Sequence, residues 1–242
     1  MKISVLSPKT SSIEGMYTEG LIAEYRFDEL EGDTLIDYSG NGNHGTFGAG
    51  GNKPTRVLNG VEFYDDYITL PDAIKNALSV QNDFTIITVS KVSSSGGTVL
   101  GSSISATDRL IINASPGMST NISPYLKYMR GCLNVGTTTA TQLAKAAGSF
   151  DVYTPHIFTY CYNNLFATGK MIIDKELYGH VSAANPSNTV GCRIGAQTSG
   201  APYLVGMLYY MLIYSKFLSN SMVQKQHRVI KKFLKQRGVV LP

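Results

Sequence analysis

Short runs of β-branched and aromatic residues, separated by turns rich in Gly, Ser and Asn, constrain the fold of this chain most strongly. In the first run, residues 21–27, the side chains of Leu21, Ala23, Tyr25 and Phe27 share one face, because successive side chains of a strand point to opposite sides. Further runs lie at residues 67–70, 84–92, 109–113, 156–162 and 171–173, with turns at residues 40–51, 93–97, 113–123 and 182–188. Many short strands with such turns favour a sandwich or jelly roll over alternating strands and helices.

One helix is predicted near the C-terminal end of the chain, within residues 219–242. Ser219 is a suitable N-cap, and Gly238 follows the last turn as a stop signal. The helix carries an apolar stripe at helical spacing, made of Met222, Val223, Val229, Ile230, Phe233 and Leu234. Because an exposed stripe of this size would favour aggregation, we expect this helix to pack on its own domain.

Composition and cysteine usage exclude several classes of protein. With 43% apolar and only 16% charged residues over 242 positions, the chain is neither disordered, a coiled coil nor a disulfide-rich miniprotein. Cys132, Cys161 and Cys192 are odd in number and lack the Cys-x-x-Cys spacing of zinc sites, so we expect buried, reduced thiols. Residues 1–20 lack the apolar stretch of a signal peptide, and the most apolar segment, residues 203–214, is too short to span a bilayer. We therefore expect maturation in a cytoplasm and no membrane insertion.

The charges are distributed unevenly. Residues 1–72 hold 12 acidic and 5 basic residues, whereas no acidic residue follows Glu176 and 8 basic residues do. Six of these 8 lie on the predicted C-terminal helix, where a solvated charged face is the usual explanation. We therefore predict no nucleic-acid partner, and the asymmetry can instead steer neighbouring copies toward one another.

The opening of the chain resembles that of a known family. Residues 21–29 form an aromatic strand that ends in Phe-Asp, and residues 37–45 read Asp-Tyr-Ser-Gly-Asn-Gly-Asn-His-Gly. Both features resemble laminin-G-like, concanavalin A-like lectin and glucanase domains. Later matches lie at residues 60–63, 66–68, 83–86, 169–174 and 206–214, then at residues 218–219 and the C-terminal helix, with Lys175 at a turn position that usually has Gly. The ending, residues 233–242, resembles laminin-G-like proteins of phages that infect gut bacteria and of their Bacteroidetes hosts.

The resemblance covers about residues 21–240 and implies the fold class. We expect an all-β, concanavalin A-like (laminin-G-like) β-sandwich jelly roll with a C-terminal α-helix. The domain organisation would then be an N-terminal arm at residues 1–20, the jelly roll at residues 21–218, and the helix, packed on the domain, at residues 219–242.

The resemblance also raises the question of calcium, because many relatives hold one ion through the opening loop and an acid on the last strand. The corresponding candidates here are Asp28, Asp37, Asn41 and Asn43. Calcium requires 6–8 oxygen ligands, usually including carboxylates. Residues 208–211 read Leu-Tyr-Tyr-Met and supply no acid at the matching position. We therefore favour a hydrogen-bonded turn and expect calcium-independent folding with no cofactor.

Some relatives hydrolyse glycosidic bonds, which requires two carboxylates about 5–5.5 Å apart for retention of configuration. On one strand, such a pair must be two or four residues apart to share a face. The nearest match is Glu31-Gly32-Asp33, which lacks the closing acid and falls in the opening loop. We therefore predict that the protein is not an enzyme.

Tyrosine is the remaining candidate for ligand recognition, with 15 Tyr and no Trp in the chain. Tyrosine stacks on sugars and anchors interfaces at a low entropic cost. Tyr125, Tyr128 and Tyr153 lie in or next to residues 93–150, where the resemblance is poorest, and are our candidates for carbohydrate binding. We expect most of the other tyrosines to pack between strands.

Two functions remain open at this stage. The first is a phage virion structural protein, a capsid-decoration or fibre module assembled in the host cytoplasm. Its partners would be other virion proteins, or copies of itself, bound through residues 1–20. The alternative is a carbohydrate-binding, lectin-like module outside a virion. A glycoside hydrolase is the least favoured function because the catalytic pair is missing.

Overall fold

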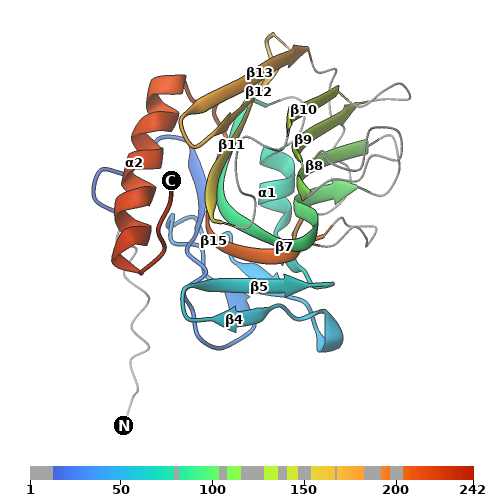
Figure 1. Cartoon of the computed structure of the whole chain (residues 1–242), viewed down its shortest axis with the longest axis vertical. Coiled ribbons are helices and arrows are strands. Elements are labelled where there is room, and N and C mark those ends of the chain that lie inside the picture. Colours follow the sequence, from blue (N-terminus) through green and yellow to red (C-terminus); the bar gives the residue numbers. More distant parts are fainter. Residues whose placement is uncertain are drawn as a thin grey trace.

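The computed structural model describes residues 13–78, 82–103, 108–115, 128–135, 141–146, 154–166, 168–182, 192–196 and 204–242. In these residues the chain forms two antiparallel β-sheets, a long C-terminal helix and two short helical segments (Figure 1). The short segments are η1 (Gly50–Asn52) and α1 (Asp72–Ala77). The predicted β-sandwich class with a C-terminal helix is confirmed.

Sheet A contains the longest strands and lies against the C-terminal helix. Its centre is β15 paired with the first part of β7, and β7 continues to β11, β12 and β13. On its other side, β15 pairs with β1 at one end and with the β4–β5 hairpin at the other. The strand bounds are β1 (Leu21–Tyr25), β4 (Thr55–Val57), β5 (Gly60–Tyr64), β7 (Phe84–Ser103), β11 (His156–Asn163), β12 (Thr168–Ile173), β13 (Glu176–Ser182) and β15 (Val205–Tyr214).

Sheet B has the strand order β10-β9-β8-β7-β14-β6-β3-β2. The strand β7 belongs to both sheets, because residues up to Gly96 pair with β15 and residues from Gly97 pair with β8. A single 20-residue strand therefore joins the two layers. The remaining bounds are β2 (Thr34–Leu35), β3 (Gly45–Phe47), β6 (Ile68–Leu70), β8 (Asp108–Ser115), β9 (Tyr128–Val135), β10 (Thr141–Ala146) and β14 (Cys192–Ile194).

Two apolar layers lie on the opposite faces of sheet A. Along β7, Phe84 and Ile86 point into the core between the sheets, whereas Ile87 and Val89 point toward the C-terminal helix. The same division holds along β11, where every residue but the last is buried. This explains why residues 156–162 alternate poorly in sequence: a strand that is covered on both faces needs no polar side.

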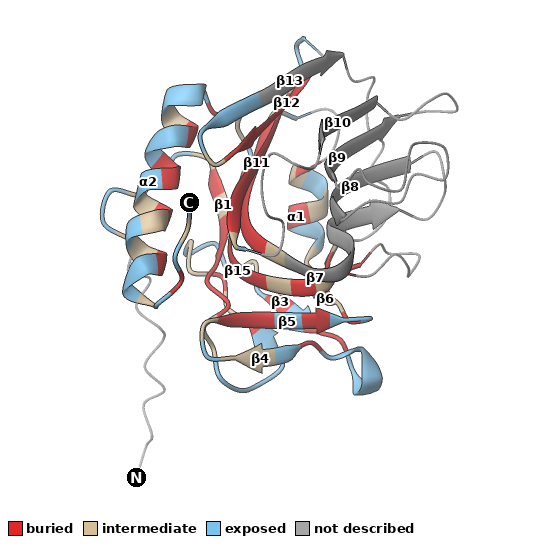
Figure 2. Cartoon of the chain, in the orientation of Figure 1, coloured by how far each residue is buried: buried red, intermediate tan, exposed pale blue. Residues whose placement is uncertain are grey.

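The C-terminal helix α2 (Asn220–Gln236) covers the outer face of sheet A, and its inward side is the buried one (Figure 2). The Ser219 Oγ accepts a hydrogen bond from the backbone N–H of Met222 at 3.3 Å, so the predicted N-cap is confirmed. Gly238 follows the helix with a φ of +81°, a conformation that favours glycine. Val223, Ile230 and Leu234 are fully buried against the sheet. None of the helices in the described residues is long and apolar enough to cross a membrane.

Residues 13–20 lie against the sandwich although they form no regular element. Ile13, Met16 and Tyr17 pack against the apolar layer between sheet A and α2. The hydroxyl of Tyr214 donates to the carbonyl of Tyr17 at 2.9 Å, and the two rings stack with centroids 6.3 Å apart. The contacts of the domain therefore begin before the predicted boundary at residue 20.

Two of the three cysteines have described side chains, and both are free thiols in buried positions. Burial raises the pKa of Cys161 to about 11 and that of Cys192 to about 12. These thiols therefore stay protonated at neutral pH. Cys132 lies on β9, where side chains are outside the described part of the chain.

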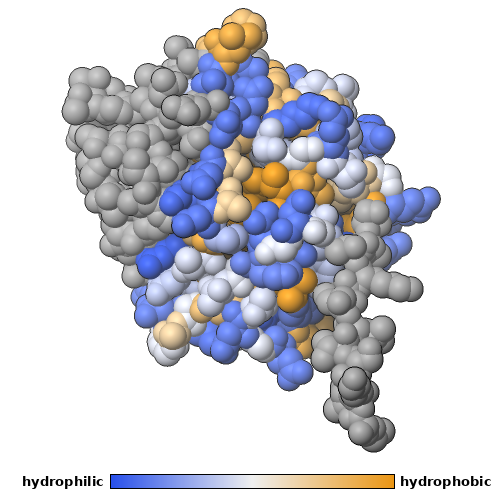
Figure 3. All heavy atoms as spheres, turned by 180° about the vertical axis from the view of Figure 1, so that it is seen from behind, coloured by the Kyte–Doolittle hydropathy of each residue, from blue (hydrophilic) through white to orange (hydrophobic). Residues whose placement is uncertain are grey.

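Among the described residues, the surface that faces away from the viewer in Figure 1 is mostly polar, with apolar side chains gathered near the centre of the view (Figure 3). The loop between β11 and β12 forms the apolar tip at the top of the same view. Leu165 and Phe166 in this loop are 83% and 71% exposed. A side-chain hydrogen bond holds the loop, because the Phe166 N–H donates to Asn163 Oδ1 at 3.0 Å.

Candidate functional site

The opening loop is built around the carboxylate of Asp37, which is buried. Its Oδ1 accepts from the backbone N–H groups of Glu24 and Ser39, and its Oδ2 accepts from the Ser39 hydroxyl and the Asn43 N–H, all at 2.9 Å. The side-chain amides of Asn41 and Asn43 donate to the carbonyls of Leu21 and Ile22. The loop is therefore pinned along the edge of β1, as the predicted hydrogen-bonded turn requires.

The four candidate calcium ligands do not share one set of partners. Asp28 accepts a hydrogen bond from the Tyr38 hydroxyl at 3.4 Å and faces Arg237 at 3.9 Å, and neither of these groups bonds the other three candidates. Within the described residues, no group of three or more His, Cys, Asp and Glu side chains could hold a metal ion. Asp37 already accepts four hydrogen bonds, so a cation at this carboxylate would have to displace them.

The acidic pair of the opening loop does not resemble a hydrolytic centre. Glu31, Gly32 and Asp33 form a bend before β2 rather than part of a strand, and all three are exposed. Asp33 forms an ion pair with Lys53 at the surface. The carbonyl of Gly32 accepts from the guanidinium of Arg56, which also bonds the carbonyl of Thr34. These contacts give the stretch a structural role in holding the loop.

The three candidate tyrosines are not brought together by the described structure. Tyr125 and Tyr153 lie outside the described residues. Tyr128 is the first residue of β9, where its backbone pairs with Ser115 on one side and Ala146 on the other. Their role in carbohydrate binding stays a prediction.

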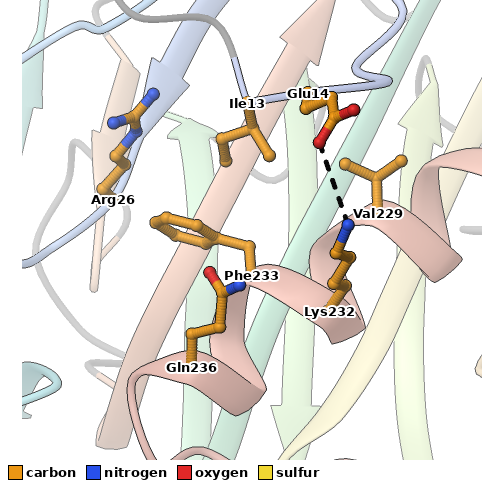
Figure 4. A pocket seen from close by; sticks show the side chains of 7 residues that line it. All are labelled: Ile13, Glu14, Arg26, Val229, Lys232, Phe233 and Gln236. Carbon is orange, nitrogen blue, oxygen red and sulfur yellow. Dashed lines mark ion pairs between the residues drawn. The ribbon is translucent and has the colours of Figure 1, made fainter.

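A pocket of about 270 Å³ lies where α2, the end of β1 and residues 13–14 meet (Figure 4). Residues from three separate parts of the chain line it: Ile13, Glu14, Arg26, Val229, Lys232, Phe233 and Gln236. The ring of Phe233 points into the space between Arg26 and Ile13. Lys232 and Glu14 face each other across the rim at 3.9 Å.

The guanidinium of Arg26 is held firmly at one side of this pocket. Its Nε donates to Glu24 Oε1 at 2.7 Å, and the same oxygen accepts from the Tyr210 hydroxyl at 2.8 Å. The Arg26 guanidinium also lies over the Tyr38 ring, 4.2 Å from its centroid. Burial, followed by the nearby charge of Glu24, raises the pKa of Tyr210 well above its ordinary value. Tyr210 therefore stays a neutral hydrogen-bond donor, and Arg26 has little freedom to move.

Phe233 supplies the apolar part of the pocket. Its half-buried ring packs on Tyr210 with centroids 5.6 Å apart, and the guanidinium carbons of Arg26 and Arg237 each lie 5.5 Å from its centroid. Gln236, which is exposed at the end of α2, adds an amide to the rim. The pocket therefore combines one aromatic ring with four polar groups: a fixed guanidinium, an amide, a carboxylate and an ammonium. This combination suits a ligand with an apolar face and polar edges.

Sequence reasoning missed this pocket although it identified its parts. The alternation of residues 21–27 places Glu24 and Arg26 opposite the apolar face, and the helical stripe contains Phe233. An arginine on the strand face that an apolar helix must cover is a usable signal, because a charge in that position needs a partner. Glu24 is a partner that the local pattern does offer, but Tyr210 and Phe233 lie about 200 positions away, and no local pattern reveals them.

The sequence matches no family model and no curated protein sequence. Among solved structures, domain 4 of AbnA, a GH43 extracellular arabinanase from Geobacillus stearothermophilus in complex with arabinotriose, is similar with a TM-score of 0.60. The two share 15% identity over 84% of this chain and 96% of that domain.

Two further solved structures cover much of this chain. Trypanosoma rangeli sialidase in complex with sialic acid matches 91% of this chain and 34% of its own, with a TM-score of 0.57 and 16% identity. The binding domain of Paraclostridial Mosquitocidal Protein 1 matches 89% of this chain and 53% of its own, with a TM-score of 0.61 and 13% identity. This chain thus spans about a third and about a half of these two structures. At such identities the likeness shows a shared β-sandwich fold, in agreement with the expected jelly roll.

Proposed function

We propose that this protein is a carbohydrate-binding β-sandwich module and that the pocket beside Phe233 holds a sugar residue of its ligand. The arabinanase domain was solved with arabinotriose and the sialidase with sialic acid, so similar folds occur in proteins that bind sugars. A shared fold does not by itself transfer a function, and the proposal therefore depends on the pocket.

The observation that carries the proposal is the pairing of the Phe233 ring with the immobilised Arg26 guanidinium in one pocket. A sugar ring presents C–H groups on its faces and hydroxyls around its edge, which match an aromatic ring and a polar rim respectively. Because Glu24 and Tyr38 already hold Arg26 in place, little side-chain entropy is lost when a ligand binds. The volume of about 270 Å³ suits one sugar residue rather than a long oligosaccharide.

The role proposed is binding and not hydrolysis. The pocket contains one carboxylate, that of Glu14, which is exposed and lies beside Lys232. Two carboxylates across a sugar bond are needed for the usual glycosidase mechanism.

The virion role stays a prediction from sequence. No solved structure described above is a phage or virion protein, and only the carbohydrate-binding alternative gains support from the comparisons. Since residues 13–20 pack on the domain, the contact with other virion proteins that was predicted for residues 1–20 would fall mainly to residues 1–12.

The proposal is tested by screening the protein on an array of neutral and acidic glycans, then measuring affinity for the best neutral glycan by titration calorimetry. The double variant Phe233→Leu, Gln236→Ala should weaken binding about tenfold or more, because it removes the aromatic face and one hydrogen-bonding group. Lys225→Ala is the matched control, since Lys225 is exposed on the same helix and lines neither this pocket nor the other pocket beside α2.

Near-UV circular dichroism verifies that the double variant keeps its fold. A protein that binds no glycan on the array contradicts the proposal. So does a folded double variant whose affinity for the neutral glycan equals that of the unchanged protein.

A further inference from the structure

A second pocket, of about 180 Å³, lies on the other side of α2, next to the turn between β12 and β13. Figure 1 shows this turn beside the helix. The pocket is lined by Asp174, Lys175, Gln224, His227, Arg228 and Lys231. Four of these come from α2 and two from the turn, so the packing of the helix on sheet A creates the pocket.

The inner part of this pocket is fixed by His227, which is buried. Its Nδ1 is hydrogen bonded to the carbonyl of Asp174, and its Nε2 lies 2.6 Å from Thr159 Oγ1. A carbonyl oxygen only accepts, so Nδ1 carries the proton and Nε2 accepts from the threonine hydroxyl. Burial lowers the pKa of His227 to about 4, so the ring is neutral at physiological pH.

Asp174, the only acid that lines the pocket, has partners on β11 for both of its carboxylate oxygens. Oδ2 lies 2.7 Å from His156 Nδ1, and Oδ1 accepts from the Ile157 N–H at 3.1 Å. Burial alone would raise the pKa of Asp174, but these two hydrogen bonds lower it below the usual value. The carboxylate is therefore ionised and engaged with the neighbouring strand.

The rim carries three cations. Lys175 and Arg228 are exposed, and neither forms an ion pair with any residue that the structure describes. Lys231 is half-buried and its ammonium donates to the carbonyl of Pro242. Partial burial lowers the pKa of Lys231, and the positive charge of Lys175 lowers it further against the opposing effect of Asp174. The sequence has no acid after Glu176, so α2 itself contributes nothing that neutralises this rim.

We infer that this second pocket binds the carboxylate of an acidic sugar residue, such as a uronic acid; the inference rests on the proposed carbohydrate-binding function. An arginine guanidinium pairs with a carboxylate through two parallel hydrogen bonds, and a lysine adds a point charge. The amide of Gln224 offers both a donor and an acceptor to ring hydroxyls.

The ionised carboxylate of Asp174 lines the pocket together with the three cations, so the pocket keeps a net positive charge that attracts an anionic ligand. The small volume limits the ligand to one acidic residue, which can be the end of a longer glycan.

The experiment compares the binding of methyl glucuronide, methyl glucoside, inorganic phosphate and inorganic sulfate to the full chain at low ionic strength. The pocket variant is Lys175→Gln, Arg228→Gln, and the charge-matched control is Lys225→Gln, Lys235→Gln, whose exposed side chains lie on α2 outside both pockets. We expect the pocket variant to bind the glucuronide about tenfold or more weakly, because two charge-assisted contacts are lost. The control should stay within about twofold of the unchanged protein, since its charges lie outside the contact.

Three results would overturn the inference. Equal weakening in the pocket variant and the control would mean general attraction to a basic helix. Binding of phosphate or sulfate without binding of the glucuronide would define an inorganic oxyanion site. A protein that binds a neutral glycan in the first pocket, but binds the glucuronide no better than the glucoside, would have no acidic-sugar site. This result would leave the proposed carbohydrate-binding function intact. In this experiment, failure to bind any glycan is the result that would also reject the proposed function.

Discussion

Single buried side chains fix the local geometry of this molecule, and Asp37 is the clearest example. Its carboxylate accepts four hydrogen bonds, three of them from backbone N–H groups, one on β1 and two in the opening loop, that need an acceptor when buried. An amide in its place could accept through only one of its two terminal atoms. The sequence pattern of Asp and Asn in a Gly-rich stretch predicted this turn, because such side chains bond their own backbone.

We predict that Asp37→Asn lowers the free energy of unfolding by about 2–3 kcal/mol, since it leaves buried N–H groups without an acceptor. Urea denaturation followed by circular dichroism measures the change. The control Asp33→Asn removes only the exposed ion pair with Lys53 and should change the free energy of unfolding far less than Asp37→Asn does, because solvent screens an ion pair at the surface. Equal losses of unfolding free energy for the two variants would show that the Asp37 hydrogen bonds do not stabilise the protein more than the surface ion pair does.

Thermal denaturation with and without millimolar calcium tests the prediction of calcium-independent folding, and we expect the same melting temperature in both conditions. A melting temperature that rises with calcium only when Asp37 is present would refute the prediction.

A second residue-scale prediction concerns His227, whose pKa in the folded protein is about 4 because the ring is buried. An unfolded histidine has a pKa of about 6.5, so the unfolded chain takes up this proton first as the pH falls. The contribution of neutral His227 to stability is therefore complete above about pH 6.5 and declines toward pH 4, by about 3 kcal/mol in total.

The measurement is the free energy of unfolding at several pH values for the unchanged protein and for His227→Gln. The difference between the two curves should change between about pH 6.5 and pH 4 and be constant above this range, because Asp174 and Lys231 titrate in both proteins. Parallel curves over the whole range would show that His227 is not responsible.

At the scale of elements, α2 completes the apolar layer on the outer face of sheet A, because its buried residues pack against β7, β11, β12 and β15. Ile230 is fully buried in this contact. We predict that Ile230→Ala destabilises the protein by about 2–5 kcal/mol through lost burial and the cavity that remains. The control Lys225→Ala, on the exposed side of the same helix, should change stability by less than about 0.5 kcal/mol. A small loss for Ile230→Ala, measured by urea denaturation, would mean that α2 packs loosely on the sheet.

Elements with a local signal could be predicted from the sequence. The alternation of Leu21 to Phe27 marks β1, and Ser219 and Gly238 mark the two ends of α2. The passage of β7 from one sheet to the other could not be predicted, because pairing partners far apart in sequence decide it. Gln226 and His227 were also missed, since both are polar residues that lie buried within the apolar side of α2.

The candidate sites were harder to predict than the fold, for the same physical reason. Each pocket lies between α2 and a segment distant in sequence, residues 13–14 and β1 in one case and the β12–β13 turn in the other. Local patterns report which face of an element is apolar, but not which element will cover it. The sequence patterns therefore did not relate Arg26 to Phe233. In the fold, the guanidinium carbon of Arg26 lies 5.5 Å from the centroid of the Phe233 ring.

At the scale of the whole molecule, residues 13–20 connect the start of the domain to its end. The backbone N–H of Tyr17 donates to Gln226 Oε1 at 3.2 Å. The hydroxyl of Tyr214 on β15 donates to the carbonyl of Tyr17, and the rings of Tyr214 and Tyr17 stack. These contacts join the lead-in, the central strand of sheet A and α2. An arm that served only to bind a partner would make no such contacts with its own domain.

We therefore predict that a chain lacking residues 1–20 is less stable than a chain lacking residues 1–12, by about 2–4 kcal/mol, because only the longer deletion removes the partly buried side chains of Ile13, Met16 and Tyr17. Thermal and urea denaturation of the two truncated proteins isolates residues 13–20 by difference. Equal stability would show that these residues rest on the surface without holding the domain together. The same two proteins test a virion role. If only the protein that lacks residues 1–20 fails to assemble into particles, the failure follows from its damaged domain. If the protein that lacks residues 1–12 also fails, partner binding is assigned to residues 1–12.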